Sequence, residues 1–365
     1  MKKPISVAVV GCGIGRAHVK AYLELPERFA LKVICDLDQE KAKSLAAASE
    51  VPEVCSSVGE LCKRPDIEVI DLCTPPHLHF EQIQEVLHAG KHVICEKPLV
   101  ASLEEADLLA EVERGSGRRI IPIFQYRFGH GLQKLKRLRA AGVTGEALVS
   151  TVETAWRRRS KYYEVPWRGN WSTELGGAVL GHAIHAHDML YYILGPAKRV
   201  FCRTATRVNP IEVEDCASAS LEMRNGSLAT LSVTLGSSSE ITRHRFCFSG
   251  MSAESNNAPY TNSKDPWTFT GDTPGKQQEI EEALKDFVPA PESFAGQFYR
   301  LYDAIQGEGE PPVSLADARE ALELVTALYY SGETGGDVSL PITPEHPRYR
   351  SWIPAAFRSP ERGRE

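Results

Sequence analysis

The 365-residue sequence lacks any long apolar run: none approaches the roughly 20 residues that a membrane-spanning helix needs. It also lacks an excess of positive charge, with 42 Lys and Arg against 48 Asp and Glu and a formal net charge of -6. Because contacts to nucleic-acid phosphates need a basic surface, this balance argues against a nucleic-acid binder. We therefore expect neither a membrane nor a nucleic acid as partner.

Cysteine pairing motifs are missing as well. The nine cysteines are odd in number, most lie inside apolar runs, and no CxxC pair occurs. This usage indicates reduced, buried thiols rather than disulfides or a zinc site. The apolar stretch 5–10 after Lys2 and Lys3 is too short for a secretory signal and leads directly into a glycine turn. We expect a cytoplasmic protein without a metal ion.

Short apolar runs alternate with amphipathic helical patterns over the first third of the chain. The pattern predicts strands at 5–10, 31–36, 67–74, 91–97 and 119–126, with helices at 15–25, 39–48, 79–90 and 102–114. Continuous apolar strands that alternate with helices are typical of a parallel sheet covered on both faces. The prediction is an α/β, doubly wound, dinucleotide-binding domain over 1–123.

The pattern of apolar residues changes after a further predicted helix at 132–142. Longer, alternating segments predict an antiparallel sheet with strands at 147–156, 199–208, 214–223, 226–236 and 241–250, including a hairpin at 224–227. A helix is predicted at 181–194, and 252–280 reads as a long loop or an irregular hairpin. Terminal helices at 294–307 and 314–333 pack on either domain in this interpretation. The second domain is assigned to 124–365.

Three glycines at alternating positions follow the first predicted strand. This spacing is one residue shorter than the usual G-x-G-x-x-G fingerprint. The turn opens a helix, where free backbone N–H groups and the helix dipole attract a pyrophosphate. Asp36 ends the second strand, where a carboxylate accepts hydrogen bonds from the adenosine ribose and repels a 2′-phosphate. The segment therefore predicts NAD rather than NADP, bound by Gly11, Gly13, Ile14, Gly15, Arg16 and Asp36.

Three further motifs resemble one known family. "CTPPHLH" (73–79), "AGKHVICEKPL" (89–99) and "GGAVLGHAIHAHDML" (176–190) are similar to signatures of the Gfo/Idh/MocA oxidoreductases. The resemblance implies an N-terminal Rossmann domain and a C-terminal α+β domain with an open, mostly antiparallel sheet that often forms the oligomer contact. It also implies cofactor contacts at Thr74, Pro75, His79 and Glu96, with Lys97 at the reacting centre.

Two departures from the family pattern concern the site. Pro76 stands where the family has an asparagine, which removes a polar side chain and a backbone N–H. If His185 is the family histidine, the position of the family's catalytic aspartate holds Gly181, and Ala183 replaces an inner glycine. The usual catalytic aspartate is therefore expected to be absent.

The proton chemistry is expected at Lys97 and His185. Oxidation of a secondary alcohol removes a hydride from carbon and a proton from oxygen, so the protein must accept a proton. Lys97 follows an apolar strand, at the edge where open α/β sheets bind ligands. On a helical wheel His182 shares a face with His185, so that it either relays the proton or lines the pocket.

Other polar groups of this helix have alternative readings. His187 is expected to be a hydrogen-bonded core histidine, and Asp188 to brace the helix. A metal site built from His182, His185 and a carboxylate is the rival reading, but no H-E-x-x-H or cysteine set supports it.

The segment "YYEVPWRGNW" (162–171) combines aromatic rings with polar groups, as sugar sites do. The rival reading is a surface loop with anchored tryptophans. Candidate substrate contacts are Tyr126, Arg127, Trp167, Arg168 and Asn170, beside Lys97, His182 and His185, and the resemblance also brings Arg168 close to the cofactor.

The sequence as a whole predicts an NAD-dependent dehydrogenase that oxidises a secondary hydroxyl of a sugar, glycoside or cyclic polyol, or catalyses the reverse reduction. One alternative is a glycosidase or lyase that recycles tightly held NAD through transient oxidation and elimination. A non-catalytic NAD-binding regulator is the other. The expected partners are a small sugar or polyol and further copies of the chain, in a dimer or tetramer formed through the C-terminal sheet.

Overall fold

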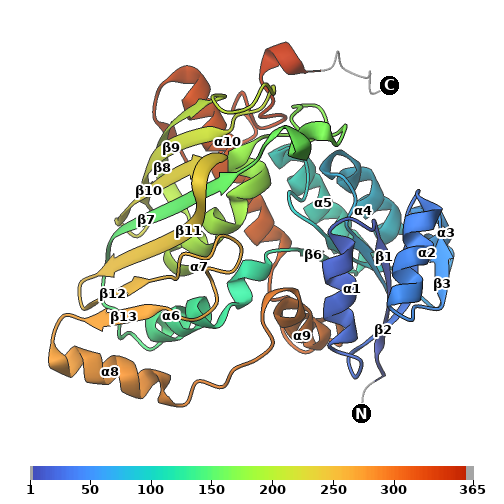
Figure 1. The fold of residues 1–365 in the computed structure, drawn as a ribbon, viewed down its shortest axis with the longest axis horizontal. Helices are drawn as coiled ribbons and strands as arrows, with labels where there is room; N and C mark the ends of the chain where they lie inside the picture. Colours follow the sequence, from blue (N-terminus) through green and yellow to red (C-terminus); the bar gives the residue numbers. More distant parts are fainter. Residues whose placement is uncertain (1–2, 359–365) are drawn as a thin grey trace. The chain divides into compact units, whose positions relative to one another are not determined.

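The computed structural model describes residues 3–358 and divides into two compact units (Figure 1). Unit 1 comprises the chain up to Phe124 together with Ser293–Arg319, and unit 2 comprises Gln125–Glu292 and the chain from Glu320 onward. Among the helices of the described part, none is long and apolar enough to cross a membrane.

Unit 1 is built on a six-stranded sheet in the order β3-β2-β1-β4-β5-β6, in which every neighbouring pair is parallel. This confirms the predicted doubly wound sheet. Its order places the switch point between β1 and β4, so the loops after these two strands diverge and leave room for a ligand. The strands are β1 (Ile5–Val10), β2 (Phe29–Cys35), β3 (Glu53–Cys55), β4 (Val69–Leu72), β5 (His92–Cys95) and β6 (Ile120–Pro122).

The helices of unit 1 come from both of its chain segments. The first segment supplies α1 (Gly15–Leu23), α2 (Gln39–Ala48), α3 (Val58–Cys62), the 3₁₀ turn η1 (Pro76–Leu78), α4 (His79–His88) and α5 (Leu103–Ser116), and the second supplies α9 (Ser293–Ile305). Residues of α1, α2 and α9 share one apolar core with β1. In that core the Tyr22 ring of α1 stacks on the Phe298 ring of α9, with centroids 4.4 Å apart. The later segment therefore completes the Rossmann core.

Unit 2 holds an eight-stranded sheet in the order β13-β12-β11-β7-β10-β9-β8-β14. All its pairs are antiparallel except β7 with β10, so the expected open, mostly antiparallel sheet is confirmed. The strands are β7 (Ala147–Arg157), β8 (Ala197–Ala205), β9 (Cys216–Met223), β10 (Leu228–Thr234), β11 (Gly236–Phe248), β12 (Met251–Glu254), β13 (Thr268–Gly271) and β14 (Val338–Ser339).

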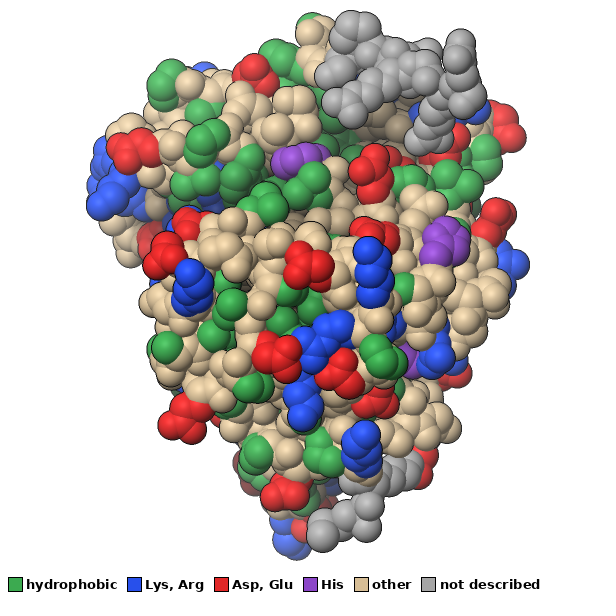
Figure 2. Space-filling view, turned by 90° about the vertical axis from the view of Figure 1, so that its right-hand side faces the viewer, with side chains coloured by type: hydrophobic (Ala, Val, Ile, Leu, Met, Phe, Trp, Pro, Cys, Tyr) green, Lys and Arg blue, Asp and Glu red, His purple; other side chains and the backbone are tan. Residues whose placement is uncertain are grey.

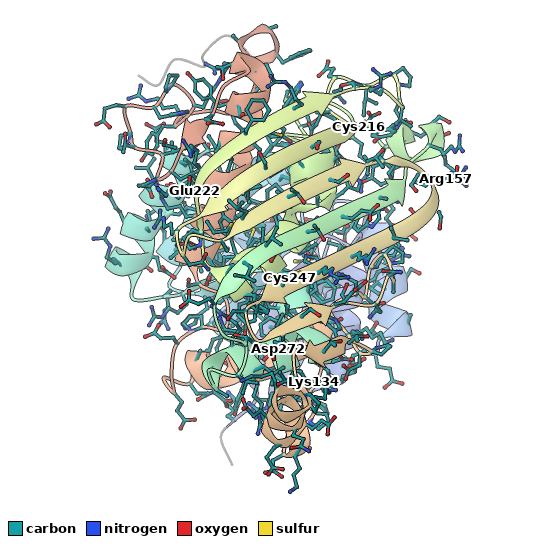
Figure 3. The ribbon with its side chains drawn as sticks, turned by 90° about the vertical axis from the view of Figure 1, so that its left-hand side faces the viewer. Lys134, Arg157, Cys216, Glu222, Cys247 and Asp272 are labelled. Atoms are coloured by element: carbon teal, nitrogen blue, oxygen red, sulfur yellow. The ribbon has the colours of Figure 1, made fainter. Side chains whose placement is uncertain are left out.

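Helices lie on one face of this sheet, and Figure 3 looks onto the other face, where no helix of the described chain covers the central strands. Burial alternates along β10, with Ala229, Leu231 and Val233 buried. The helical elements are η2 (Gln125–Phe128), α6 (His130–Ala140), η3 (Ser160–Glu164), the π-helical turn η4 (Ala178–His182), α7 (Ile184–Leu194), α8 (Pro274–Lys285), η5 (Ala355–Phe357) and α10 (Leu315–Thr334), whose first turn is assigned to unit 1.

Charged side chains of both signs are interspersed on the face of the molecule shown in Figure 2, without a broad area of a single sign. This mixture agrees with the balanced composition of the chain, 42 basic against 48 acidic residues.

The structure corrects or refines the sequence-based expectations in three places. The strand predicted at 119–126 ends at Pro122, because the chain turns into η2 from Gln125 onward. The antiparallel β12–β13 pair makes part of 252–280 a hairpin, one of the two expectations for this stretch, but the beginning of α8 within it was not predicted, because its polar composition resembles a loop. The hairpin at 224–227 is confirmed, although only Gly226 adopts a positive φ, of 86°.

The turn that leads into α7 is held by a buried carboxylate. Glu214 accepts hydrogen bonds from the backbone N–H groups of Gly177 (3.0 Å) and Val179 (2.8 Å) and from the Tyr329 hydroxyl (3.0 Å). A Cβ at Gly177 would lie 1.8 Å from the Glu214 carbonyl oxygen, and a Cβ at Gly176 would lie 2.4 Å from the Tyr329 hydroxyl oxygen. The Gly176–Gly177 pair is therefore required for the chain to approach Glu214 and Tyr329 this closely.

Burial raises the pKa of Glu214 to about 7, although its hydrogen bonds partly oppose this. Since the folded state keeps a proton that the unfolded chain releases above a pKa of 4.5, stability falls as pH rises from about 4.5 to 7 and is level beyond. We expect Glu214→Gln to remove this loss, on the order of 3 kcal/mol. Calorimetric unfolding between pH 5 and 8 measures it. Tyr329→Phe keeps the titrating carboxylate and should keep the loss; an unaltered pH dependence in Glu214→Gln would contradict the assignment.

Candidate functional site

The glycine turn after β1 lies against the end of β4. Gly11 has φ of +97°, and a Cβ there would lie 2.6 Å from the Cys73 carbonyl oxygen. Gly15 packs on the Val9 side chain, where a Cβ would meet a carbon at 3.1 Å, while a Cβ on Gly13 would meet nothing within 4 Å. Gly11 and Gly15 therefore serve close backbone packing, and Gly13 leaves its side of the turn open.

The N-terminus of α1 faces this open side without a side-chain cap. Ile14, the N-cap residue, makes no capping hydrogen bond and is 47% exposed, and Arg16 is exposed in the first turn. Uncapped backbone N–H groups at a helix N-terminus form an anion site. The arrangement suits a pyrophosphate at this position.

Asp36 directly follows β2, and its carboxylate is tied to the glycine turn. Its Oδ2 accepts from the Cys12 N–H at 2.7 Å and its Oδ1 accepts from the Asp38 N–H at 2.8 Å. Each carboxylate oxygen retains a lone pair for a further donor. The carboxylate is thus fixed in orientation and can accept from a ribose hydroxyl.

The loop after β4 is joined to the loop after β5 by His79. One ring nitrogen lies 2.9 Å from the Thr74 carbonyl oxygen and the other 2.9 Å from the Pro98 carbonyl oxygen. Burial lowers the pKa of His79, and in its neutral form the ring donates to only one of the two carbonyl oxygens. Pro75 precedes η1, and Pro76, at the position of the family asparagine, is buried as its first residue.

Glu96 and Lys97 follow β5 at the same carboxyl edge of the sheet. One Glu96 oxygen lies 3.1 Å from the Nε2 of His18, and the other accepts from the Lys97 backbone N–H at 3.0 Å. Lys97 is half-buried and precedes a cis peptide bond to Pro98. Unit 1 therefore gathers the glycine turn, Asp36, Thr74, Glu96 and Lys97 along one edge of its sheet.

In unit 2 the aromatic rings surround two histidines. The His185 ring stacks on the Tyr126 ring at 4.6 Å between centroids, and the His182 ring lies 5.8 Å from Trp156 and 5.5 Å from Tyr162. His182 belongs to the π-helical turn and His185 to α7, so the regular helical wheel used for the sequence does not relate the two residues.

The other two polar groups of α7 serve structure. Asp188 forms a buried, bidentate ion pair with Arg127, with distances of 2.8 Å to Nε and 2.6 Å to Nη2, which braces α7 against η2. His187 is buried as expected, and burial beside His244 lowers its pKa to about 3. Neither of its ring nitrogens has a hydrogen-bond partner among the described residues, unlike the satisfied histidine that the sequence suggested.

Arg168 lies among aromatic rings, with its guanidinium 3.9 Å from the Tyr162 centroid and 4.3 Å from the Trp167 centroid. It pairs with Glu174 at 3.3 Å, and burial lowers its pKa. The Asn170 amide donates to the Arg168 carbonyl oxygen at 2.8 Å and so stabilises its own loop.

A carboxylate lies beside Gly181 even though the family aspartate is absent. The nearest atom to a Cβ built on Gly181 is the Glu174 Oε1, at 3.8 Å, so the position has room for a side chain. Sequence reasoning missed Glu174, and it also missed Glu214 and a buried group around His18 in unit 1. The available signal for that group was Asp71, an acidic residue within the apolar strand β4.

The residues of unit 1 fit a dinucleotide. Gly13 is open, α1 begins without a side-chain cap, and Asp36 is oriented at the end of β2. These are the features expected for binding a pyrophosphate and an adenosine ribose next to a switch point between β1 and β4.

Comparison with known proteins agrees with this geometry. Residues 5–124 match the GFO/IDH/MocA family described as "Oxidoreductase family, NAD-binding Rossmann fold", and residues 132–253 match the "GFO/IDH/MocA C-terminal domain".

Individual relatives extend the likeness. An uncharacterised oxidoreductase of Synechocystis sp. is 28% identical over 244 residues, 63% of this chain and 65% of that protein. D-glucoside 3-dehydrogenase of Escherichia coli is 28% identical over 368 residues, 92% of this chain and 98% of that protein.

Among solved structures, the WlbA dehydrogenase from Bordetella pertussis, in complex with NADH and UDP-GlcNAcA, has a TM-score of 0.82 and 27% identity over 93% of this chain and 100% of that one. The sheet orders of the two units and these matches together show that the chain belongs to the GFO/IDH/MocA family of oxidoreductases, with NAD as its cofactor.

Proposed function

We propose that the protein is an NAD-dependent dehydrogenase that oxidises a secondary hydroxyl of a sugar, glycoside or cyclic polyol to a ketone, or catalyses the reverse reduction. The observation that carries the proposal is the position of Glu96 and Lys97, directly after β5 and at the strand edge that also bears the glycine turn and Asp36. Similarity to D-glucoside 3-dehydrogenase, and to inositol 2-dehydrogenase of Gluconacetobacter diazotrophicus (25% identity over 230 residues), supports the substrate class.

The reaction divides between cofactor and protein. NAD, when bound, accepts the hydride from the carbinol carbon. The hydroxyl proton leaves to a side-chain base, for which we assign Lys97 and His185, and the C–O bond becomes a carbonyl. The Tyr126 ring, stacked on His185, fixes the plane of the imidazole. The His182 ring lies between Trp156 and Tyr162. From this position His182 either lines the substrate pocket or relays the proton.

Substrate contacts are proposed for the aromatic part of unit 2. Sugars present apolar C–H faces to rings and hydroxyls to cations and amides. Trp167, Tyr126 and Arg168 offer such groups. Arg127 and Asn170 are held by Asp188 and by loop carbonyls, so we assign them to shaping the pocket.

A recycling glycosidase or lyase is the second candidate. It is favoured by similarity to a glycosyl hydrolase family 109 protein of Streptomyces filamentosus, 29% identical over 191 residues, and by glycine at position 181 in place of the aspartate. In such an enzyme NAD is reduced and reoxidised within each turnover, so free NADH does not accumulate.

We also propose that the uncovered face of the unit 2 sheet joins copies of the chain. The outward residues of β10 pair with those of β7, Leu228 opposite Val149 and Thr230 opposite Thr151. Leu228 and Val149 are 55% and 43% exposed, which is unusual for apolar residues on the central strands of a sheet. The neighbouring strand β11 adds Arg243 and Arg245 to this face, both paired with Glu254 of β12. A face that combines exposed apolar side chains with ion pairs suits a second copy of itself.

Lys97→Ala tests the assigned chemistry. A screen of cyclitols, aldoses and glycosides for NADH formation identifies a substrate, and net NADH distinguishes the dehydrogenase from the recycling enzyme. With that substrate we expect kcat to fall at least about 100-fold in Lys97→Ala, as for loss of a general acid–base group, while the Kd of NADH, measured by fluorescence, changes by less than about threefold. Lys43→Ala, an exposed lysine on α2, is the control. Full turnover in Lys97→Ala would refute the role.

Asp36→Ala tests the ribose contact. Loss of charge-assisted hydrogen bonds worth about 1.5–3 kcal/mol should raise the Kd of NADH roughly 10- to 100-fold. Removal of the negative charge should also reduce the preference for NADH over NADPH, expressed as the ratio of the two Kd values. Both constants come from fluorescence titration. Asp38→Asn, two residues further on, should bind NADH as wild type does. An unchanged NADH/NADPH ratio in Asp36→Ala would contradict the assignment.

Thr230→Arg tests the sheet interface. A bulky charge at the centre of a self-complementary face should convert the assembly to monomers in sedimentation velocity. The control Val288→Arg changes a residue that is 81% exposed, away from the sheet, and should leave the assembly intact. A wild-type monomer, or a Thr230→Arg variant that still associates, would argue against this interface.

A further inference from the structure

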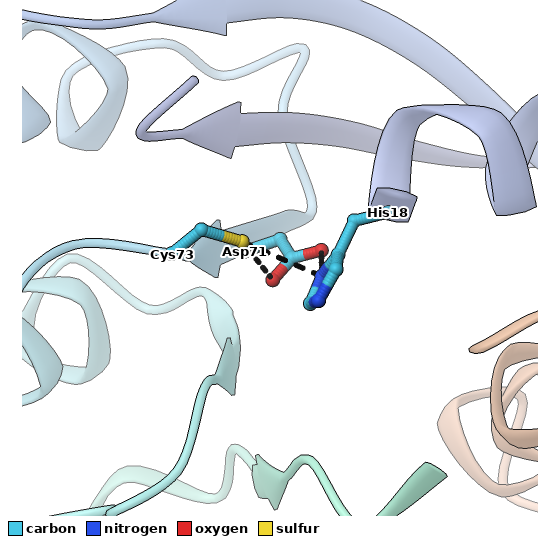
Figure 4. Close-up of side chains that lie close together, drawn as sticks. All are labelled: His18, Asp71 and Cys73. Carbon is cyan, nitrogen blue, oxygen red and sulfur yellow. Dashed lines mark hydrogen bonds and ion pairs between the residues drawn. The ribbon is translucent and has the colours of Figure 1, made fainter. Parts of the chain in front are cut away.

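A buried group of polar side chains lies beneath the loops that follow β4 and β5 in unit 1. His18, on α1, is 0% exposed, and its Nδ1 lies 2.8 Å from the Asp71 Oδ2. Figure 4 marks the contact between these two side chains with a dashed line. Its Nε2 lies 3.1 Å from the Glu96 Oε1. The imidazole thus bridges a carboxylate on β4 and a carboxylate just after β5.

Further side chains contact both Asp71 and His18. The Tyr22 hydroxyl donates to the Asp71 Oδ2 at 2.9 Å, and the Cys73 sulfur lies 3.4 Å from the His18 Nδ1. From α9, the Phe294 and Phe298 rings pack on the imidazole, with centroids 4.4 and 5.5 Å away. If the imidazole rotated away from this orientation, it would lose at least one of its two carboxylate contacts. Hydrogen bonding and the packing of the two phenylalanine rings therefore fix its orientation together.

The contacts of His18 favour an imidazolium, because both of its ring nitrogens face carboxylate oxygens, which can only accept hydrogen bonds. Burial is the largest single influence and opposes the charge, but Asp71 and the neighbouring Cys73 together outweigh it, so the pKa of His18 is raised well above its ordinary value. Both ring nitrogens then carry protons and donate to carboxylates. Although His18, Asp71 and Cys73 are close enough together to hold a metal ion, an imidazolium has no lone pair to offer. Burial also raises the pKa of the Cys73 thiol, which stays protonated.

The bridge continues to the backbone of Lys97. The second oxygen of Glu96 accepts from the Lys97 N–H at 3.0 Å. Hydrogen bonds therefore connect Asp71, through His18 and Glu96, to the backbone nitrogen of Lys97. The side chain of Lys97 carries the proposed catalytic amine. Each link is a hydrogen bond to a charged group, the kind that contributes most to fixing geometry.

We propose that His18 is a positioning residue: anchored by Asp71 on one ring nitrogen, it holds the Glu96 carboxylate with the other, and Glu96 in turn fixes the backbone of Lys97. The catalytic consequence rests on the function proposed above for Lys97, whereas the positioning itself does not. A displacement of about 1 Å at a reacting group costs up to about 100-fold in rate, so a buried brace of this kind affects turnover without touching substrate.

Two substitutions separate the two ends of the bridge. In His18→Gln the amide nitrogen can take the place of Nε2 and keep the donor to Glu96, whereas in His18→Asn it takes the place of Nδ1 and keeps only the donor to Asp71. Both variants lose the charge and part of the ring. A merely structural histidine predicts similar effects of the two substitutions, and the positioning role predicts that His18→Asn is the more damaging at Lys97.

Hydrogen exchange of the cofactor-free protein measures the brace directly. We expect the Lys97 amide to exchange at least about tenfold faster in His18→Asn and within about threefold of wild type in His18→Gln, since only the first variant frees the Glu96 acceptor. The amides of Val93 and Ile94, in β5 itself, are the internal reference and should not change. Tyr22→Phe removes a donor to the same Asp71 carboxylate but leaves the His18–Glu96 contact. In this variant the Lys97 amide should therefore exchange at the wild-type rate.

The possible results each decide the matter. Unchanged exchange at Lys97 in a folded His18→Asn variant, or equal acceleration at Lys97, Val93 and Ile94, would overturn the positioning role. If neither His18 variant folds, Asp71→Asn gives the second measurement, because it weakens the anchor on the His18 Nδ1 and leaves Glu96 and the Lys97 N–H unchanged. Acceleration confined to Lys97 in that variant supports the brace, and its absence refutes it.

Turnover then distinguishes this inference from the proposed function. With a substrate from the screen, His18→Asn should lower kcat at least about tenfold, with KM and the Kd of NADH within about threefold, and His18→Gln should recover most of the loss. Faster exchange at Lys97 together with a fully active Lys97→Ala would leave the brace in place and remove the catalytic role of the lysine. Normal exchange with an inactive Lys97→Ala would do the reverse.

Discussion

The close approach of Gly11 to the end of β4 is the constraint on which the proposed cofactor site, at the carboxyl edge of the unit 1 sheet, depends. Because a Cβ at Gly11 would lie 2.6 Å from the Cys73 carbonyl oxygen, only glycine lets the turn after β1 pass so near to its neighbouring strand. The turn then directs the start of α1 over the switch point of the sheet, and Asp36 can reach back to the Cys12 N–H. The three-glycine spacing, short as it is, thus still leads into a helix that begins without a side-chain cap, as a phosphate-binding turn requires.

Unit 2 places its histidines by the same means. Gly176 and Gly177 let the chain run against Tyr329 and the Glu214 backbone, and the Glu214 carboxylate satisfies two N–H groups of the turn. The π-helical turn and α7 begin from this anchored point. In both units, a glycine contact with backbone or with a buried polar group determines where a helix that carries proposed site residues starts.

The sequence predicted the parallel sheet, the glycine turn and the position of Asp36 because each has a local signal: apolar runs, glycine spacing and an acidic residue at a strand end. It could not predict α8, whose polar residues resemble a loop, or the parallel pairing of β7 with β10, which depends on contacts remote in the chain. Glu214, Glu174 and His18 were missed for a related reason. The partners of Glu214 and His18 are distant in sequence, so no spacing motif reveals them. Glu174 lies six residues from its partner Arg168, but no known motif marks that spacing.

The division of unit 1 between two chain segments has a consequence for its synthesis. Phe298 and Leu301 of α9 lie in the same apolar core as β1, so the first 124 residues leave the ribosome without the helix that covers them. Between the two segments lie the 168 residues of Gln125–Glu292. Until these residues have been synthesised, part of the apolar surface of the nascent Rossmann sheet stays exposed to solvent. During this time the exposed surface can bind chaperones or aggregate.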